Sequence, residues 1–430
     1  MSQMAPQGTL PSAGAGIDAA PVTDTFNHIM DTYNGGNIEA ENVDPTEIAL
    51  LATTQAFTGD KTFSGLAAFT GTHSGLPFFV DAVVAGSGAD YSTIQAADNA
   101  LDAAAGYRLR VAGSQTYAET VTVSTNYNVW YVDSLTVITS LVLSGQGNTV
   151  ILGASCQFTG DITLSGNHNK VVFGQDANLD GHITLSGTAN ELHCGAGANL
   201  ATSKTLLLSG ANSKAIIGAQ FACPGIISMT ADDTYLEIGN QSVITGAQTL
   251  ATGSGQVMKF GNDCQLVGNT ELQSADNELH MGSTANIDGT VAMTGSNAKM
   301  TVGDNSSLAQ TLTFAVGTNQ KFIAGDSVQV VGNIAMAGLD SWMEFGSDAN
   351  LDGTVICSSS RQTFIVGGQS NLASTLAVTT GSRSLAQIGP GTIVAGTVTM
   401  SGAKSQLRAL SGADFGGIVT LSGAGCSLIC

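Results

Sequence analysis

The sequence predicts a mainly β protein whose longest part is a parallel β-solenoid, a β-helix of single-chain type with three short strands in each coil. A strand that ends in Gly recurs at steps of 21 to 23 residues, and a Leu-Ser-Gly segment or a near variant recurs in another phase of the same period. A period of this size indicates one small unit stacked on the next. The strand-ending glycines are Gly153, Gly174, Gly195, Gly218, Gly239, Gly261, Gly282, Gly303, Gly325, Gly346, Gly367 and Gly389. The second set is Gly145, Gly166, Gly187, Gly210, Gly253, Gly295, Gly317, Gly338, Gly381, Gly402 and Gly423.

A third repeated element completes the coil. It reads Ala-Asn-Leu or Ala-Asn-Ile, with its Asn at Asn178, Asn199, Asn286 and Asn350. Short segments such as residues 162–165 and 398–401 alternate apolar and small polar residues, which is typical of strands with one buried face. The repeat runs from about 141 to 423, which predicts roughly thirteen coils and a shaft of about 60 Å, because stacked strands lie about 4.8 Å apart.

Polar residues mark the expected corners. An Asn follows the second Gly after two or three residues, and stacking should place these residues in ladders that stabilise the fold. These residues are Asn148, Asn169, Asn190, Asn212, Asn297 and Asn319, and Asn277 lies at the equivalent place in a coil that lacks the Gly. Asp-Gly corners occur at Asp180, Asp288 and Asp352, but the nine-residue repeat of calcium-binding solenoids is absent. We therefore do not expect a calcium site.

The composition narrows the range of partners. Acidic residues outnumber basic ones by 33 to 13, which gives a net charge of −20. So few cations cannot neutralise many phosphates, and we expect no nucleic-acid partner. No stretch reaches the roughly 18 apolar residues of a membrane helix, and residues 1–20 lack a signal-peptide pattern. We expect a protein that is made in a cytoplasm, has no membrane partner and does not follow the general secretory route.

The seven cysteines show neither a CxxC pair nor a Cys/His spacing typical of zinc. No metal ion or cofactor is predicted. We interpret Cys156, Cys194, Cys223, Cys264 and Cys357 as small apolar residues of the interior. Cys426 and Cys430 lie at the end of the chain and are candidates for a disulfide, with each other or with a neighbouring subunit.

The N-terminal part differs from the repeat. Residues 1–23 are rich in Pro, Ala and Gly and predict an extended leader, and residues 24–84 form a second region. In this second region, the residues Phe-Thr-Gly-Asp-Lys-Thr-Phe-Ser-Gly at 57–65 follow Asn37-Ile38 and Asn42. With these residues the chain resembles the N-terminal parts of bacteriophage tail-fibre and related virion appendage proteins. The resemblance implies a virion-anchoring region in which Asn37, Ile38, Asn42, Phe57 and Phe63 contact other virion proteins.

Residues 85–140 carry a second resemblance. The residues Gly-Ala-Asp-Tyr-Ser-Thr-Ile-Gln-Ala-Ala at 88–97, followed by segments 108–111 and 116–121, look like the entry segment of pectin-lyase-like β-helices. This resemblance implies a short helix at 94–105 that caps the open end of the solenoid. A cap is needed because a bare solenoid end is an unpaired sheet edge. Residues 141–430 then form the shaft.

The pectin-lyase-like family includes polysaccharide lyases and tailspike depolymerases, so an enzyme is the main alternative. Glycosidase chemistry needs two carboxylates about 5 to 9.5 Å apart. Two clusters merit attention, Asp232-Asp233 with Glu237, and Asp340 with Glu344 beside Trp342. We interpret both as surface residues at a corner or on an outward strand face, and we assign no catalytic residue.

These observations together predict a non-enzymatic structural fibre of a phage virion, on the tail, collar or head. The resemblance to phage appendage proteins implies a homotrimer, anchored through residues 1–70 to other virion proteins, that projects its shaft toward a host receptor or glycan. Two alternatives stay open: a tailspike depolymerase that cleaves host surface polysaccharide, and a bacterial surface adhesin. An adhesin should carry a secretion signal, which residues 1–20 do not show.

Overall fold

A computed structural model describes residues 82–85, 89–101 and 106–430. The predicted leader and nearly all of the predicted anchoring region lie outside the described residues, and with them Asn37, Ile38, Asn42, Phe57 and Phe63.

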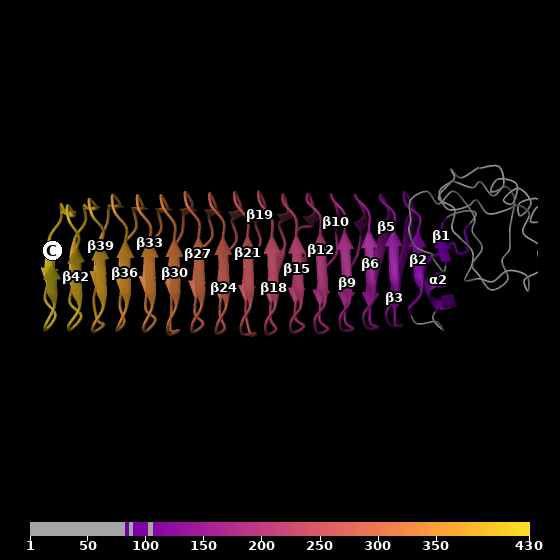
Figure 1. The fold of residues 1–430 in the computed structure, drawn as a ribbon, viewed down its shortest axis with the longest axis horizontal. Helices are drawn as coiled ribbons and strands as arrows, with labels where there is room; N and C mark the ends of the chain where they lie inside the picture. Colours follow the sequence, from indigo (N-terminus) through magenta and orange to yellow (C-terminus); the bar gives the residue numbers. More distant parts are fainter. Residues whose placement is uncertain (1–81, 86–88, 102–105) are drawn as a thin grey trace, which may run out of the picture. The chain divides into compact units, whose positions relative to one another are not determined.

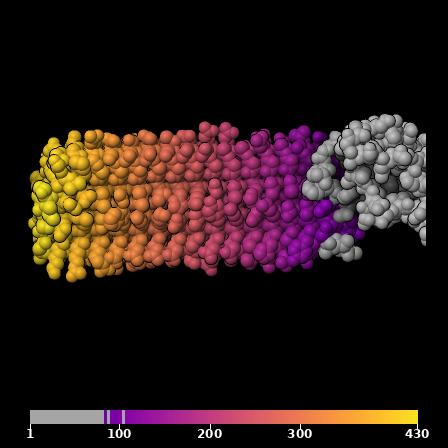
Figure 2. Space-filling view, in the orientation of Figure 1, coloured from indigo at the N-terminus to yellow at the C-terminus, as the bar shows by residue number. Residues whose placement is uncertain are grey.

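The described chain forms a parallel β-solenoid of about 15 turns, as predicted (Figure 1). Each strand pairs in parallel with the equivalent strand of the next coil. From β2 onward the register joins residues 20 to 23 positions apart, for example Glu191 with Lys214, whereas β1 and β2 join residues 27 apart. The coils therefore lie in unbroken contact along the stack (Figure 2).

One side of the coil, which we call sheet A, is built mainly from four-residue strands. Its strands are β1 Ala82–Val84, β2 Arg108–Val111, β4 Val129–Val132, β6 Thr149–Leu152, β9 Lys170–Phe173, β12 Glu191–Cys194, β15 Lys214–Ile217, β18 Tyr235–Ile238, β21 Val257–Phe260, β24 Glu278–Met281, β27 Lys299–Val302, β30 Lys321–Ala324, β33 Trp342–Phe345, β36 Thr363–Val366, β39 Leu385–Ile388, β42 Gln406–Ala409 and β45 Ser427–Ile429.

The other two sides belong to one continuous sheet. The second side is β7 Gln157–Phe158, β10 Asn178–Leu179, β13 Asn199–Leu200, β16 Ala222–Cys223, β19 Val243–Ile244, β22 Gln265–Leu266, β25 Asn286–Ile287, β28 Ser307–Leu308, β31 Gln329–Val330, β34 Asn350–Leu351, β37 Asn371–Leu372, β40 Ile393–Val394 and β43 Asp414–Phe415. The third side is β8 Ile162–Leu164, β11 Ile183–Leu185, β14 Thr205–Leu208, β17 Ile226–Met229, β20 Gln248–Leu250, β23 Thr270–Leu272, β26 Val291–Met293, β29 Leu312–Phe314, β32 Ile334–Met336, β35 Val355–Cys357, β38 Leu376–Val378, β41 Val398–Met400 and β44 Val419–Leu421.

Two coils precede the start of the predicted repeat. Their strands β3 (Thr116–Val123) and β5 (Val137–Leu143) run through the second and third sides without a Gly corner, and their register shifts between Tyr117 and Thr120. The count from the glycine repeat leaves these coils out because their second and third sides are joined without its Gly corner. The stack is longer than thirteen coils for this reason.

The core is one continuous cluster of buried side chains that runs from coil to coil. It follows from strict alternation in the strands, as in β9, where Val171 and Phe173 are buried and their neighbours point outward. Equivalent positions stack, as in the column Phe322, Met343 and Phe364. The ring of Phe345, two residues further along β33 than Met343, lies with its centroid 5.4 Å from Phe322 and 6.2 Å from Phe364. The five cysteines interpreted as interior residues are all buried, which confirms that prediction.

Each coil turns through residues with left-handed backbone. The corner before sheet A, which we call the leading corner, places one positive φ two residues ahead of every strand from β4 to β45. Gly, Asn or Asp, which tolerate this conformation, fill nine of these fifteen positions. The fifteen residues are Tyr127, Gly147, His168, Ala189, Asn212, Asp233, Gly255, Asp276, Asn297, Asn319, Asp340, Arg361, Arg383, Lys404 and Gly425.

The predicted Asn ladder is two columns. Asn148, Asn169, Asn190 and Asn277 are buried and face inward, directly before a sheet A strand. Asn212, Asn297 and Asn319 lie one position earlier, where φ is positive and the side chain faces outward. The spacing from the preceding Gly varies by one residue, so the sequence pattern joined two different sites.

A short helix, α2 (Ile94–Leu101), forms within the predicted entry segment. The carboxylate of Glu119 accepts hydrogen bonds from the backbone N–H of Ile94 at 2.6 Å and of Gln95 at 3.2 Å, which satisfies donors at the helix N-terminus. Ile94 and Ala97 belong to the core cluster. Residues 102–105 lie outside the described part, and the capping role of this segment stays a prediction.

Candidate interaction face

The outer face of sheet A and its leading corner carry almost all the cations of the described chain. The sequence has 13 Lys and Arg, of which Lys61 lies outside the described residues, leaving 12. Eight of them point outward from sheet A strands, three occupy the leading corner, and Lys204 is the remaining one. The eight are Arg108, Arg110, Lys170, Lys214, Lys259, Lys299, Lys321 and Arg408, and the three are Arg361, Arg383 and Lys404.

Acidic residues are distributed differently. On the outward positions of the sheet A strands they number four, Glu191, Glu237, Glu278 and Glu344. On these strand positions there are eight cations and four carboxylates, and the leading corner adds three cations and three carboxylates, Asp233, Asp276 and Asp340. The outer face of sheet A is therefore basic, although the chain as a whole carries −20. The sequence did not predict this face, because the cations are scattered along the chain and gather only when the coils stack.

Two partly exposed aromatic rings, Tyr235 and Trp342, lie on the same face. The ammonium nitrogens of Lys214 and Lys259 lie 5.0 and 5.3 Å from the ring centroid of Tyr235, from the coils on either side. The ammonium of Lys321 lies 5.7 Å from the ring of Trp342. Both geometries are cation–π contacts, and they hold the rings at fixed places on the outer surface.

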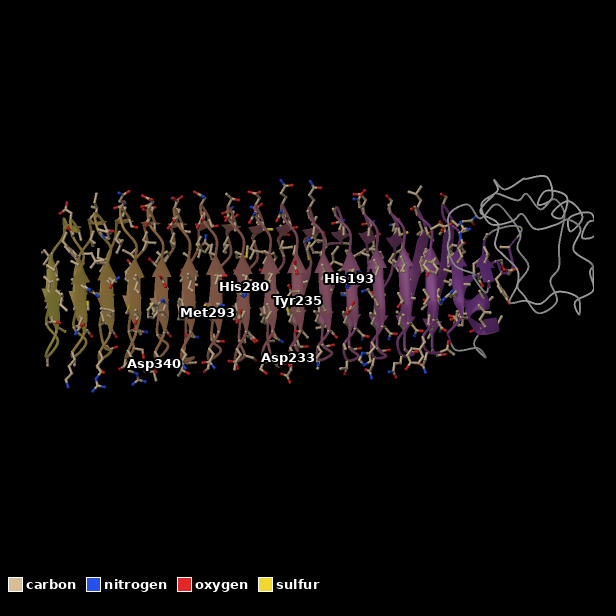
Figure 3. The ribbon with its side chains drawn as sticks, viewed as in Figure 1. His193, Asp233, Tyr235, His280, Met293 and Asp340 are labelled. Carbon is tan, nitrogen blue, oxygen red and sulfur yellow. The ribbon has the colours of Figure 1, made fainter. Side chains whose placement is uncertain are left out.

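A Glu-Leu-His motif occurs twice on sheet A. The Glu191 carboxylate contacts the Lys170 ammonium of the neighbouring coil at 2.8 Å and His193 Nε2 at 3.0 Å. The hydrogen bond from Lys170 is the main cause that holds the pKa of Glu191 below its usual value. Glu278 repeats the arrangement with His280 at 2.6 Å (Figure 3). Local pairs of this kind fix the side chains of the face in place.

The first predicted carboxylate cluster is already engaged by neighbours. Asp232 accepts from the backbone N–H of Ser254 at 2.8 Å, and Glu237 accepts from the Tyr235 hydroxyl at 2.6 Å. Asp233 occupies the leading corner with a φ of 53° (Figure 3). No hydrogen bond within the described chain joins these carboxylates, and the cluster shows no shared site for an acid and a base.

The second carboxylate cluster is also paired. Asp340 forms a two-point contact with the guanidinium of Arg361 on the next coil, with Oδ2 2.6 Å from Nη2. Glu344 accepts from the indole N–H of Trp342 at 3.1 Å. The hydrogen bonds from Arg361 hold the pKa of Asp340 below its ordinary value. Each of the two carboxylates thus accepts hydrogen bonds from a neighbouring side chain.

The Asp-Gly corners bind other side chains. Asp180 accepts from the amides of Gln157 at 2.7 Å and Asn178 at 3.4 Å, and Asp288 accepts in the same way from Gln265 and Asn286, both at 3.0 Å. Within the described residues, no three His, Cys, Asp or Glu side chains are grouped so that they could hold a metal ion.

Both C-terminal cysteines are free thiols in the structure. The Cys426 thiol is partly buried and donates to the carbonyl oxygen of Gly402 at 2.9 Å, and Cys430 is exposed. Their pairing with each other or with a neighbouring copy stays a prediction. None of the described helices is long and apolar enough to span a membrane.

Comparison with known proteins adds no relative. A scan against protein-family models, a search of curated proteins and a search of solved structures find no match to this chain.

Proposed function

We propose that this chain is a structural fibre protein of a phage virion, in which the solenoid is a rigid shaft that presents sheet A to a host surface. The observation that carries the proposal is the unbroken stack of about 15 turns with one core. Every strand is hydrogen-bonded to the next coil, so bending the shaft would break many backbone hydrogen bonds at once.

The N-terminal resemblance supplies the virion setting. A segment like residues 57–65 precedes a repetitive β-rich shaft in phage appendage proteins, and here a solenoid follows it. In this proposal, residues 1–70 bind other virion proteins through Asn37, Ile38, Asn42, Phe57 and Phe63. In this proposal the chain assembles as a homotrimer, as in the appendage proteins it resembles. The three shafts are separate, because each coil closes within one chain.

Localisation tests this proposal. An antibody raised against residues 106–430 should decorate projecting fibres on purified virions in negative-stain electron microscopy. Failure to find the chain in purified virions by immunoblot and microscopy would contradict the proposal. Release of new reducing ends from host capsule or lipopolysaccharide by the purified protein would instead support the depolymerase alternative.

A further inference from the structure

Three cations are stacked at the leading corner near the C-terminal end of the shaft. Arg361, Arg383 and Lys404 occupy the same position in successive coils and are exposed. The backbone N–H of Arg361 donates to Ser382 at 2.8 Å, and that of Arg383 to Ala403 at 2.9 Å. The column is therefore held in register at the coil spacing of about 4.8 Å.

Three cations in this column destabilise the folded protein in two ways when no ligand is bound to them. The three residues have φ values of 58°, 60° and 58°, a conformation that disfavours long side chains. Asn or Gly fills the same position in other coils, as at Asn297 and Gly255. Three like charges at this spacing also repel one another. Residues that are retained despite both backbone strain and like-charge repulsion point to a function.

Only one end of the column has an internal counterion. Asp340 pairs with Arg361 from the preceding coil. Among the ion pairs of the described chain, none involves Arg383 or Lys404. The outer face of the next strand adds Arg408, which is also exposed. The charge of this segment is thus left for an external anion.

An aromatic surface adjoins the column. Trp342 lies two residues after Asp340 on the outer face of β33, and its indole N–H is held by Glu344 at 3.1 Å. The ring is partly exposed, with the Lys321 ammonium 5.7 Å from its centroid. We call Trp342, Arg361, Arg383, Lys404 and Arg408 the C-terminal basic strip.

We propose that the C-terminal basic strip binds a linear acidic polysaccharide laid along the shaft. Carboxylate or sulfate groups of the sugar chain would bind the stacked guanidinium and ammonium groups through charge-assisted hydrogen bonds. The apolar face of one sugar ring would pack on Trp342. This inference deepens the proposed function and rests on it for its biological setting.

The arrangement fits a sugar chain better than a nucleic acid. Single-stranded nucleic acids are bound by a series of aromatic rings that stack successive bases, whereas this strip has one ring at one end. The surrounding chain also carries −20, which opposes a dense phosphate backbone. A polysaccharide with more widely spaced charges suffers less of this repulsion.

The test is a binding titration with the full-length protein. The probes are polygalacturonate, neutral dextran and oligothymidylate, measured by calorimetry at moderate salt. Wild type should bind polygalacturonate and not dextran. The double variant R383N/K404N should lose about tenfold or more of this affinity, while it keeps its fold because Asn suits this corner. W342A should also weaken binding.

A matched control uses the one described cation away from the face. K404N should weaken binding, whereas K204N, with the same change of charge, should leave it unaltered. Equal binding by wild type and R383N/K404N would overturn the proposal, as would equal binding of dextran or tighter binding of oligothymidylate. These results do not depend on whether the chain is found in virions, so this inference and the proposed function can fail separately.

Discussion

The side-chain carbonyl oxygen of Asn169 accepts a hydrogen bond from the backbone N–H of Asn148, one coil earlier, at 2.8 Å. The Asn169 amide donates in turn to the carbonyl oxygen of Gly145 at 2.8 Å, and its own backbone N–H donates to Asn190 at 2.8 Å. The column thus satisfies buried backbone groups that the corner leaves without strand partners.

Replacing Asn169 with Ala should destabilise the shaft by about 2–4 kcal/mol, because it leaves buried polar groups unpaired. Urea denaturation followed by circular dichroism measures the change. Hydrogen exchange of the Asn148 amide should also become faster. The control is Asn199→Ala, which removes the same side chain from an exposed strand position and should change stability by less than about 0.5 kcal/mol. Similar losses in the two variants would contradict the account.

The strand-ending glycines are required by the close approach of neighbouring coils. A Cβ on Gly174 would lie 2.6 Å from the carbonyl carbon of Gly153, which is backbone and cannot move aside easily. Gly174→Ala should therefore cost about 1–3 kcal/mol. Gly416→Ala, where a Cβ would meet nothing nearer than 3.8 Å, should be close to neutral. Thermal melts of the two variants measure the difference in stability. A neutral effect of Gly174→Ala would argue against the close approach of neighbouring coils at this glycine.

The leading corner predicts opposite effects for the same substitution at two sites. Ala189 has a φ of 54°, whereas Ala219 is not among the residues with positive φ. Ala189→Gly should stabilise the protein by about 1 kcal/mol through relief of the left-handed strain. Ala219→Gly should destabilise it by about 0.4–1 kcal/mol, because Gly adds freedom to the unfolded chain. Denaturation midpoints that shift in the same direction for both variants would exclude this backbone geometry.

The Glu191–Lys170 pair predicts a dependence on pH. Because the pKa of Glu191 is lowered in the folded protein, chiefly by Lys170, the ionised carboxylate stabilises the fold. This contribution is complete above the usual value of 4.5 and is lost as the pH falls through the lower folded-state pKa. The effect is small, since solvent screens the partly exposed pair.

Denaturation midpoints of wild type and Glu191→Gln measure this effect. Their difference should be largest above pH 4.5 and should shrink as the pH is lowered below that value. When Lys170 is replaced by Met, the effect of Glu191→Gln on stability should depend much less on pH. A double-mutant cycle measures this coupling. A difference that grows on acidification would contradict the assignment.

The sequence predicted the solenoid well because each coil depends on local features that recur at one period. Glycine at the close approaches and alternation in the strands can both be read without knowing the structure. The glycine repeat leaves out the first two coils, because β3 and β5 replace a Gly corner with continuous strand, and only the likeness of residues 85–140 to a solenoid entry segment includes them. Asn169 and Asn297 were placed in one ladder because their positions differ by a single residue in phase.

The basic face is harder to predict, because it depends on the phase of each residue within its coil. Lys170, Lys214 and Lys299 each follow a buried residue that ends the leading corner. This placement was present in the sequence, but it is recognisable only once the corner positions are aligned coil by coil. Arg383 and Lys404 are 21 residues apart and become neighbours only through stacking.

The most direct test of the central claim, a rigid shaft projecting from a virion, uses Cys430. Five cysteines are buried, and burial raises the pKa of the Cys194 and Cys357 thiols to about 12. Cys426 is partly buried and donates a hydrogen bond to Gly402, so Cys430 is the one fully exposed thiol of the described chain. Maleimide-linked gold on intact virions, with a Cys430→Ser phage as control, should appear at the tips of fibres, at least about 70 Å from the particle for 15 coils. Gold that is absent, or that lies at the particle surface, would contradict the account.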